Sequence, residues 1–346
     1  MVVKQPFRMK TMIRFLYLLT AMTLLTAVAC TTDPKQPDPQ GQTPPKSDTT
    51  TGKPALNVPS FSADSAYSFV QKQVDFGPRV PGTPQHKACA DWLEATFKRF
   101  TPTTFIQSAS VKAHDGKKLP IYNIIATFNP QASRRILLCA HWDTRPNADQ
   151  DTERKDEAIL GANDGGSGVG VLLEIARQLS ANPIQTLGVD IVLFDTEDYG
   201  DYGVDDSFCL GSQYWSKNLH TPGYKAEYGI LLDMVGAPDA LFLQELNSLN
   251  YAPDVVKKVW GVANELGYGS YFINKPTRAP ITDDHIYVNQ LAHIPTIDII
   301  HYTYEGSFGA YWHTHKDNMK AVSKSTLQSV GHTLLTVVYR EGVNYW

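Results

Sequence analysis

Apolar residues recur after position 60 with the spacings that helices and strands require. A period of three to four residues predicts helices over residues 62–75 and 86–100. A glycine- and proline-rich stretch, residues 76–83, separates them. Two short β-branched runs, residues 121–128 and 135–140, flank an Asn-Pro turn and predict a pair of adjacent strands. We therefore expect two helices that pack on a sheet.

From residue 140 onward, strand-like and helix-like segments alternate. The predicted strands cover residues 188–194, 228–234 and 296–301, and the predicted helices cover residues 165–180, about 212–219, 251–266 and 323–339. Near-continuous apolar strands of this kind are typical of a parallel sheet that helices cover on both faces. The pattern predicts an α/β fold, a three-layer α/β/α sandwich around a central, mostly parallel mixed sheet. In such sheets, ligands bind beyond the carboxyl ends of the strands.

The first 59 residues have a different composition. Residues 1–14 carry four basic side chains and no acidic one, residues 15–29 are apolar, and small residues precede Cys30. This is the pattern of a bacterial lipoprotein signal peptide, although alanine stands where such signals usually have leucine. An uncleaved membrane anchor is the alternative. Residues 30–59 are polar and proline-rich, as in a disordered tether, so residues 60–346 are expected to form a single catalytic α/β domain.

Lipid on Cys30 would tether an exported protein to a membrane, in the periplasm or at the outer membrane. Loss of residues 1–29 removes four positive charges and changes the formal net charge from -4 to -8. Such an acidic chain argues against nucleic acid as a partner. Three further cysteines, Cys89, Cys139 and Cys209, leave at least one free thiol, and the pairing of any disulfide among them stays open.

Polar residues directly follow several of the predicted strands. In a parallel sheet, the carboxyl ends of these strands should lie at one edge. The glycine-rich turn at residues 161–168 runs directly into a helix, and such a junction holds the side chain of Asp164 in a crevice. Other acidic or imidazole side chains at strand ends or in a late aromatic loop are His141, Glu197, Asp198, Asp233 and His313.

A shared metal ion would explain why carboxylates gather at one edge of the sheet. Clustered carboxylates raise each other's pKa and destabilise a fold, and a divalent cation removes that penalty. Asp164 and Asp198 as oxygen ligands and His313 as nitrogen ligand leave an open fourth position, as in catalytic zinc sites. The imidazole favours zinc over magnesium. Glu197, next to Asp198, would project toward the open position as a general acid and base.

Five motifs stand in one order along the chain: the glycine-rich turn at residues 161–168, Phe194-Asp-Thr-Glu-Asp198, Leu232-Asp-Met-Val-Gly236, Asp283-Asp-His285 and Trp312-His-Thr314. In this order they resemble the zinc aminopeptidase and glutaminyl cyclase superfamily of exported metallohydrolases, over roughly residues 62–340. Within it, the chain is similar to type II glutaminyl-peptide cyclotransferases in a bacterial lipoprotein form. The resemblance implies a zinc-exopeptidase-like fold. It also implies cyclisation of the N-terminal glutamine of peptides or proteins to pyroglutamate, with release of ammonia.

The resemblance implies roles for the residues of the metal cluster. Asp164, Asp198 and His313 correspond to the ligands of a single zinc ion, and Glu197 corresponds to the proton-transfer residue. The chain departs from the animal cyclases at Asp198, where those enzymes have glutamate. The shorter side chain would have to bring the metal nearer its own backbone.

The resemblance also implies a substrate pocket. Asp233 and Asp283 correspond to the acidic pair that hydrogen-bonds around the scissile amide. Trp312 and Phe308 correspond to the aromatic walls that hold the glutamine side chain. Gly203 falls where an ungapped match would put a further pocket tryptophan, which leaves that side to a nearby tyrosine or to no side chain.

Two other functions remain open. A zinc aminopeptidase, which removes N-terminal residues, would hold a second zinc ion with His141 and Asp233, and Asp164 would bridge the two metals. Trp312 before the metal histidine and Asp283, where peptidases usually have serine, favour the cyclase. A non-catalytic peptide-binding lipoprotein is the third reading, although such a protein would be expected to lose a ligand or the proton-transfer glutamate.

Overall fold

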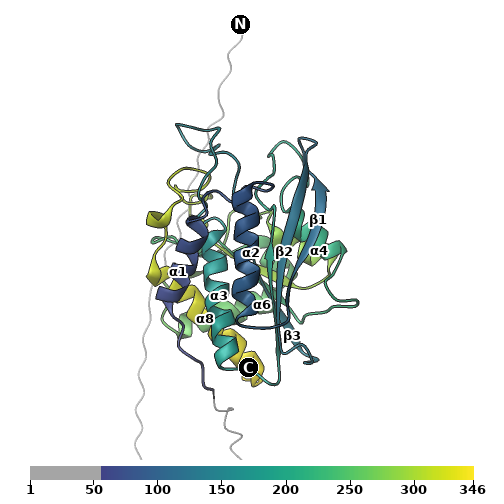
Figure 1. Ribbon diagram of the computed structural model, residues 1–346. Coiled ribbons are helices and arrows are strands. Elements are labelled where there is room, and N and C mark those ends of the chain that lie inside the picture. Colours follow the sequence, from purple (N-terminus) through teal and green to yellow (C-terminus); the bar gives the residue numbers. More distant parts are fainter. Residues whose placement is uncertain (1–55) are drawn as a thin grey trace, which may run out of the picture. The chain divides into compact units, whose positions relative to one another are not determined.

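A mixed sheet of six strands, in the order β1-β2-β4-β3-β5-β8, forms the centre of the computed structural model, which describes residues 56–346 (Figure 1). The strands are β1 (Thr104–Lys112), β2 (Lys118–Phe128), β3 (Arg135–His141), β4 (Gly188–Phe194), β5 (Gly229–Asp233) and β8 (Thr296–Ile300). Strands β4, β3, β5 and β8 run parallel to one another, and the β1–β2 and β2–β4 pairs are antiparallel. A second sheet pairs β6 (Phe242–Gln244) with β7 (Phe272–Pro276).

The N-terminal predictions fall outside this description. The signal peptide, Cys30 and most of the predicted tether precede residue 56. The first helix, α1 (Ala63–Val74), begins after Ser62, whose hydroxyl accepts a hydrogen bond from the Ser65 backbone as an N-cap. Between residues 56 and 346, no helix is long and apolar enough to cross a membrane.

Strands β2 and β3 are not neighbours, so the predicted pairing of residues 121–128 with 135–140 is wrong. Strand β4 lies between them, antiparallel to β2 and parallel to β3. Arg135, at the start of β3, binds the Asp190 carboxylate of β4 through two hydrogen bonds of 2.7 and 2.8 Å. The side chain of Asn129 donates to the carbonyls of Ile184 and Gln185, just before β4. These long-range contacts place β4, and a local turn signal cannot reveal them.

The antiparallel partner of β2 is β1, which the sequence analysis did not predict. β1 is an edge strand, and most of its residues are exposed or half-buried. Serine and glutamine side chains therefore interrupt the apolar run that would have marked it. A strand with little buried surface leaves little hydrophobic signal in the sequence.

The described helices are α1 (Ala63–Val74), α2 (Pro84–Lys98), α3 (Gly166–Ala181), α4 (Leu210–Lys217), α5 (Leu246–Tyr251), α6 (Pro253–Glu265), α7 (Asp284–Leu291) and α8 (Lys324–Gly342), with the 3-10 turn η1 (Met319–Ala321). The predicted helix 251–266 corresponds to α6, which begins at Pro253 because proline fits the first turn of a helix but not its interior. Helix α7 was not predicted. Its first six residues are all buried, so it lacks the polar face that reveals a helix by periodicity.

Helices cover both faces of the main sheet. Figure 1 shows α1, α2, α3 and α8 side by side on one face, where each contacts another of the set. Helices α4 and α7 contact each other, and their Trp215 and Val288 pack with Leu137 and Cys139 of β3 in the apolar cluster of the opposite face. The three-layer α/β/α prediction is confirmed.

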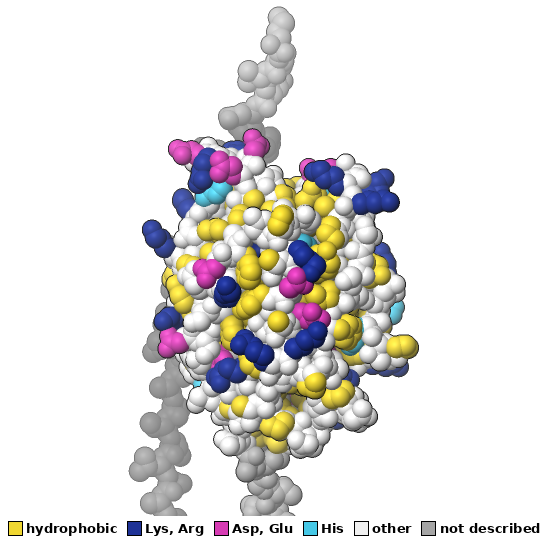
Figure 2. All heavy atoms as spheres, viewed as in Figure 1, with side chains coloured by type: hydrophobic (Ala, Val, Ile, Leu, Met, Phe, Trp, Pro, Cys, Tyr) yellow, Lys and Arg dark blue, Asp and Glu magenta, His cyan; other side chains and the backbone are white. Residues whose placement is uncertain are grey.

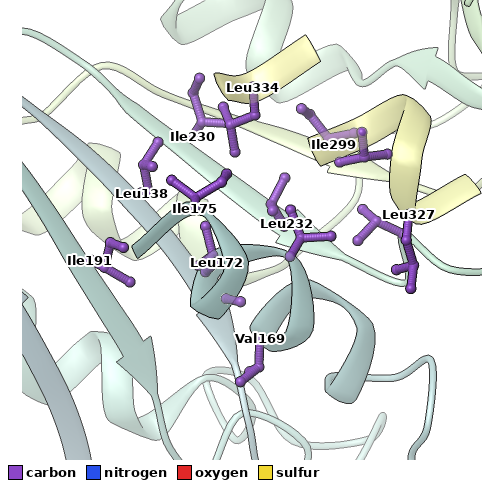
Figure 3. Close-up of a cluster of buried hydrophobic side chains, with 14 of the residues drawn as sticks. Leu138, Val169, Leu172, Ile175, Ile191, Ile230, Leu232, Ile299, Leu327 and Leu334 are labelled. Carbon is purple, nitrogen blue, oxygen red and sulfur yellow. The ribbon is translucent and has the colours of Figure 1, made fainter. Parts of the chain in front are cut away.

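Helix α3 occupies the middle of the larger apolar cluster. Figure 3 shows Val169, Leu172 and Ile175 of this helix beside Leu138 and Leu232 of the sheet. Further labelled members come from β4, β5, β8 and α8: Ile191, Ile230, Ile299, Leu327 and Leu334. Burial of so many large side chains, each worth about 1.5–3 kcal/mol, fixes the position of α3. Its N-terminus, and the glycine-rich turn before it, are fixed with it.

The outer side of these helices faces solvent. Figure 2 shows acidic and basic side chains interspersed among hydrophobic ones on this face. Along α2, Lys87 pairs with Asp91 and Lys98 pairs with Glu94, both at i,i+4 spacing. Exposed pairs of this kind contribute only about 0.3–0.5 kcal/mol each to the free energy of unfolding. They therefore add little to the stability of the fold.

Candidate active site

The parallel strands deliver polar side chains to one edge of the sheet. His141 is the last residue of β3 and Asp233 is the last residue of β5. Glu197 and Asp198 follow the end of β4 by three and four residues. Because β3, β4 and β5 run in the same direction, their carboxyl ends meet, as expected for a ligand site in an α/β sheet.

The glycine-rich turn brings Asp164 to the same edge. The buried guanidinium of Arg79 donates to the carbonyls of Leu160 and Gly161 at 2.8 and 2.7 Å. A Cβ added at Gly165 would lie 2.4 Å from the carbonyl oxygen of His141, so only glycine allows the turn to approach β3 this closely. This approach explains the glycine and sets Asp164 beside the end of β3.

Asp164, Asp198 and His313 form one cluster. All three are buried, and each offers a ligand atom within 4.8 Å of the others. His313 Nε2 lies 3.2 Å from Asp198 Oδ1 and 3.7 Å from Asp164 Oδ2. The structure thus brings together the three residues that the sequence analysis assigned to a metal.

The cluster fits a divalent cation. Within residues 56–346, Asp198 Oδ2 is buried and has no hydrogen-bond partner, and burial raises the pKa of Asp198. Burial lowers the pKa of His313, but the carboxylates around it, Asp198 first, raise that pKa to about 9. A bound cation would therefore stabilise the buried carboxylates of this cluster. Two carboxylates with one imidazole suit zinc better than magnesium.

His141 belongs to a second, overlapping cluster with Asp164 and Asp233. His141 Nε2 lies 3.1 Å from both Asp164 Oδ1 and Asp233 Oδ1. Burial lowers the pKa of His141, but the surrounding carboxylates of Asp143, Asp164 and Asp233 outweigh it and hold the pKa well above its usual range. This geometry suits a hydrogen-bonded imidazolium as well as a second metal ligand.

Glu197 lies between the two clusters. Its backbone N–H and that of Asp198 donate to the two oxygens of Asp143, at 2.9 and 3.1 Å. The Cys209 thiol donates to Glu197 Oε1 at 3.3 Å, and Oε2 lies 4.0 Å from His141 Nδ1. Burial raises the pKa of Glu197 well above its ordinary value. A raised pKa makes a glutamate a better proton acceptor, as a general acid and base requires.

Asp233 and Asp283 line the same cavity from different elements. Asp283 is the N-cap of α7, and its Oδ2 is buried without a hydrogen-bond partner among the described residues. Burial raises the pKa of Asp283, and it raises the pKa of Asp233 to about 7. A carboxyl group can accept a hydrogen bond when ionised and donate one when protonated, so these two residues can hold a polar substrate group.

Aromatic side chains enclose a cavity of about 290 Å³ over these acids. Trp312 stacks on His313 with ring centroids 4.0 Å apart, and Phe308 lies 4.5 Å from Trp312. Tyr202 meets Trp312 edge-on at 6.2 Å and lines the cavity. Tyr202 therefore occupies the side of the pocket that Gly203 leaves open. The volume lies at the small end of ligand pockets and suits a single side chain.

Several residues that organise the site were not predicted from the sequence. Asp317 accepts hydrogen bonds from the backbones of Asn163 and Asp164, at 2.8 and 3.1 Å. Arg145 and Asp149, in the loop after β3, contact Asp198 and His313. Each of these residues is distant in sequence from its partner, so no motif spacing could have identified it.

Cys89, Cys139 and His315 belong to none of the candidate metal clusters of the described chain, whereas Cys209 belongs to one with Glu197 and Asp283. Cys89, Cys139 and Cys209 are buried thiols, none of which forms a disulfide within residues 56–346. His315 directs its Nε2 to the carbonyl of Arg154, 3.1 Å away. Cys209 alone of the three cysteines touches the site, through its hydrogen bond to Glu197.

Known proteins share this architecture. The model of peptidase family M28 matches residues 123–338. A glutaminyl-peptide cyclotransferase of Drosophila melanogaster is 26% identical over 280 residues, which cover 73% of this chain and 74% of the fly protein.

Two solved bacterial structures are more similar in sequence. Porphyromonas gingivalis glutaminyl cyclase is 55% identical, with a TM-score of 0.79, and covers 81% of this chain and 99% of its own. A Zn-dependent exopeptidase from Parabacteroides distasonis is 51% identical, with a TM-score of 0.79, and covers 82% of this chain and 99% of its own. The family match spans more than half of the sequence, and the resemblance stated from the motifs is confirmed: the chain belongs to peptidase family M28.

Proposed function

We propose that this protein is a zinc-dependent glutaminyl-peptide cyclotransferase, which converts the N-terminal glutamine of peptides or proteins to pyroglutamate and releases ammonia. The observation that carries the proposal is the aromatic cavity of about 290 Å³ directly over the cluster of Asp164, Asp198 and His313. The names of the fly and Porphyromonas gingivalis relatives support the same activity.

Asp164, Asp198 and His313 would hold the zinc ion. Zinc bound there would polarise the γ-carbonyl of the glutamine side chain and favour attack on its carbon. The name of the Parabacteroides distasonis relative, a Zn-dependent exopeptidase, supports zinc as the metal. One zinc ion is sufficient for the proposed reaction, and His141 would then act as a charged partner of Asp164 and Asp233, each 3.1 Å from its Nε2.

Glu197 would move the proton. The α-amine of the substrate attacks its own γ-amide carbon, so one proton must leave the amine and one must reach the departing nitrogen. With Oε1 held by Cys209, Oε2 is the oxygen that remains to carry this proton. The raised pKa of Glu197, caused by burial, makes this carboxylate a stronger base for proton transfer. Asp233 and Asp283 would hydrogen-bond the amide and the amine.

The aromatic walls would supply orientation. Both reacting groups belong to one residue, so holding the bent conformer against Trp312 and Phe308 makes the reaction effectively unimolecular. An enclosed wall also keeps bulk water from the reacting carbon. Water is the reactant of a peptidase and the competitor of a cyclase.

An aminopeptidase with one or two metals is the second candidate, favoured by the overlapping cluster of His141, Asp164 and Asp233 and by the Parabacteroides distasonis relative. A non-catalytic peptide-binding role is disfavoured, because Glu197 and all three ligands of the first cluster are present.

The two activities differ in the mass of the product. Purified protein is incubated with a synthetic peptide that begins with glutamine, and the product is weighed by mass spectrometry. Loss of one ammonia is expected. Loss of a whole residue would establish the aminopeptidase instead, and an unchanged mass with measurable peptide binding would establish the binding protein. The same glutamine peptide incubated without enzyme controls for spontaneous cyclisation.

The N-terminal segment suggests where the reaction takes place. We infer that Cys30 carries lipid and that the enzyme acts on exported peptides, in the periplasm or at the outer membrane. The basic, apolar and small-residue order of residues 1–29 supports this. Replacement of Cys30 by serine should release the protein from the membrane fraction. A variant that stays membrane-bound would point to an uncleaved anchor.

A further inference from the structure

A buried arginine, Arg145, lies directly behind the metal cluster. Its side chain is 4% exposed. Nη1 donates to the carbonyls of Asp198 and Gly200, at 2.9 and 3.0 Å. Nε and Nη2 bind the two oxygens of Asp149, at 3.0 and 3.3 Å. The guanidinium also lies over the ring of Tyr202, 5.4 Å from its centre.

Asp149, which binds Arg145, also contacts the proposed metal ligand His313. Its Oδ1 lies 3.2 Å from His313 Nδ1, and the Tyr202 hydroxyl lies 3.0 Å from the same nitrogen. A proton on Nδ1 that is held by a carboxylate leaves Nε2 free to bind a metal and makes it more basic. Nε2 is the nitrogen that faces Asp198 and Asp164. The contacts behind His313 therefore set its tautomer and its orientation.

From these contacts, we propose that Arg145 and Asp149 form a clamp that positions two zinc ligands at once, His313 through the Asp149 carboxylate and Asp198 through its backbone carbonyl. The proposal rests on the zinc site proposed above but not on the identity of the substrate. Arg145 and Asp149 are positioning residues, because neither lines the cavity.

The clamp fixes the backbone of Asp198, whose side chain is shorter than that of the glutamate in animal cyclases. An aspartate reaches less far than a glutamate, so its backbone must be held at a fixed distance from the metal. Arg145 Nη1 holds the carbonyls of Asp198 and Gly200 while Nε and Nη2 hold the two oxygens of Asp149, a planar arrangement of donors that lysine cannot reproduce. The guanidinium carbon also lies 5.3 Å from the centre of the Phe208 ring.

The clamp also adds no net charge to an acidic site. Asp149 accepts hydrogen bonds from the Arg145 guanidinium through both carboxylate oxygens and lies 3.2 Å from His313 Nδ1, an arrangement that suits an ionised carboxylate. The positive Arg145 balances that charge. His313 therefore gains an ionised acceptor without further repulsion among the buried acids.

The test measures zinc binding rather than turnover. Zinc affinity of the purified protein is determined by competition with a chelator for Asp149→Ala, Asp149→Asn and Arg145→Lys. We expect affinity roughly 10–100-fold weaker for Asp149→Ala, in line with other groups that orient metal ligands. Asp149→Asn, which keeps an acceptor but loses the charge, should lie between Asp149→Ala and the unmodified protein. Tyr202→Phe, which keeps the ring, should lose less.

Thermal melting separates positioning from a merely structural role. With the metal removed by chelator, Asp149→Ala should melt close to the unmodified protein, and the rise in Tm on adding zinc should be smaller. Asp149 is 23% exposed on its side chain, so this variant is expected to fold even if Arg145→Lys does not. Arg154→Met is the matched control. Its guanidinium pairs with Glu157 in the same loop, but both side chains are more than half exposed.

The His313→Ala variant distinguishes failure of the clamp from failure of the proposed zinc site. If His313→Ala binds zinc normally, the proposed zinc site itself is wrong. If His313→Ala loses zinc while Asp149→Ala keeps normal affinity, the clamp is wrong and the zinc site stands. A lower Tm of metal-free Asp149→Ala with unchanged zinc affinity would also overturn the clamp, since it would show a purely structural role.

Discussion

Several carboxyl side chains at this site are buried, which makes their ionised forms unfavourable. Burial raises the pKa of Asp233 to about 7 and raises the pKa of Glu197 and Asp198 as well. Within the described chain, Asp198 Oδ2 and Asp283 Oδ2 are buried without hydrogen-bond partners. Unsatisfied buried groups of this kind cost about 1–3 kcal/mol each, so they point to a function that uses them.

Glu197→Gln tests proton transfer by one residue. The amide keeps the shape of the side chain but cannot accept the proton, so turnover should fall by about 10²–10⁴-fold. Zinc content and Tm should stay unchanged. Steady-state kinetics and elemental analysis provide the measurements. Glu157→Gln, an exposed glutamate of the 145–160 loop, is the control, and comparable activity of the two variants would rule out the assigned role.

Cys209→Ala tests whether the thiol orients Glu197. The Sγ–Oε1 hydrogen bond of 3.3 Å is weak, so its loss should cost about 1 kcal/mol, or roughly fivefold in kcat. KM should change little, and Cys209→Ser should restore most of the activity. Cys89→Ala, buried in α2, should lower Tm but leave kcat unchanged. If Cys209→Ala also lowers Tm and leaves kcat unchanged, Cys209 contributes to packing and does not orient Glu197.

At the scale of elements, tight connections after the strands position the chemistry. Thr196 and Met234, which follow β4 and β5, have left-handed backbones with φ of 57° and 48°, and so does His313, with φ of 51°. Such conformations cost non-glycine residues about 1–2 kcal/mol and cluster at functional sites. The packing of α3 and the parallel strands stabilises these turns.

Asp317→Asn tests the link between the C-terminal segment and the Asp164 turn. One oxygen that accepts a backbone N–H would be replaced by an amide donor, so we expect a loss of about 1–3 kcal/mol in the free energy of unfolding. Urea unfolding with chelator present measures this without a metal contribution. Asp151→Asn is the control, since Asp151 also accepts a backbone N–H, from His315, but is only partly buried. Equal stability of the two variants would contradict the proposed link.

His220, just beyond α4, predicts a dependence of stability on pH. Burial lowers its pKa from 6.5, and its Nδ1 accepts a hydrogen bond from Trp215 Nε1 at 3.2 Å. The unfolded chain therefore binds the proton more readily than the folded one. Stability should be full above about pH 6.5 and should fall as the pH drops below it.

The measurement compares melting at about pH 7 and pH 5 for the unmodified protein and His220→Gln. The variant has lower stability at neutral pH, because the ring packs on Tyr224 at 4.3 Å, but its Tm should drop less on acidification. His114→Gln, at an exposed position, should retain the original slope. Identical slopes in all three proteins would assign the acid sensitivity to other groups.

At the scale of the whole molecule, zinc should stabilise the fold. The metal binds clustered carboxylates that exist only in the folded chain, and a ligand at 100 times its dissociation constant adds about 2.7 kcal/mol. Chelator should therefore lower Tm by several degrees, and zinc should restore it where magnesium does not. His313→Ala should show little response to the chelator. A Tm that is insensitive to chelator in the unmodified protein would contradict a bound metal.

The layered fold and the cluster of site residues could be inferred from local patterns. Apolar periodicity indicated most of the helices and strands, and the parallel alternation placed Asp164, Glu197 and Asp198 at one edge of the sheet. The edge strand β1, the buried helix α7 and the order of β2, β4 and β3 could not be inferred. Their formation depends on long-range partners such as Arg135 with Asp190, which leave no local signature.

The sequence by itself determined the class of the fold, the residue types at the strand ends and their order, because hydrophobic spacing and glycine turns act locally. Only the tertiary structure decided which oxygens face one another, that Tyr202 closes the pocket, and that Arg145 and Asp149 reach His313 and Asp198. Such contacts join residues separated by tens to more than a hundred positions. Their distances depend on how whole strands and helices pack, and no spacing within a motif encodes them.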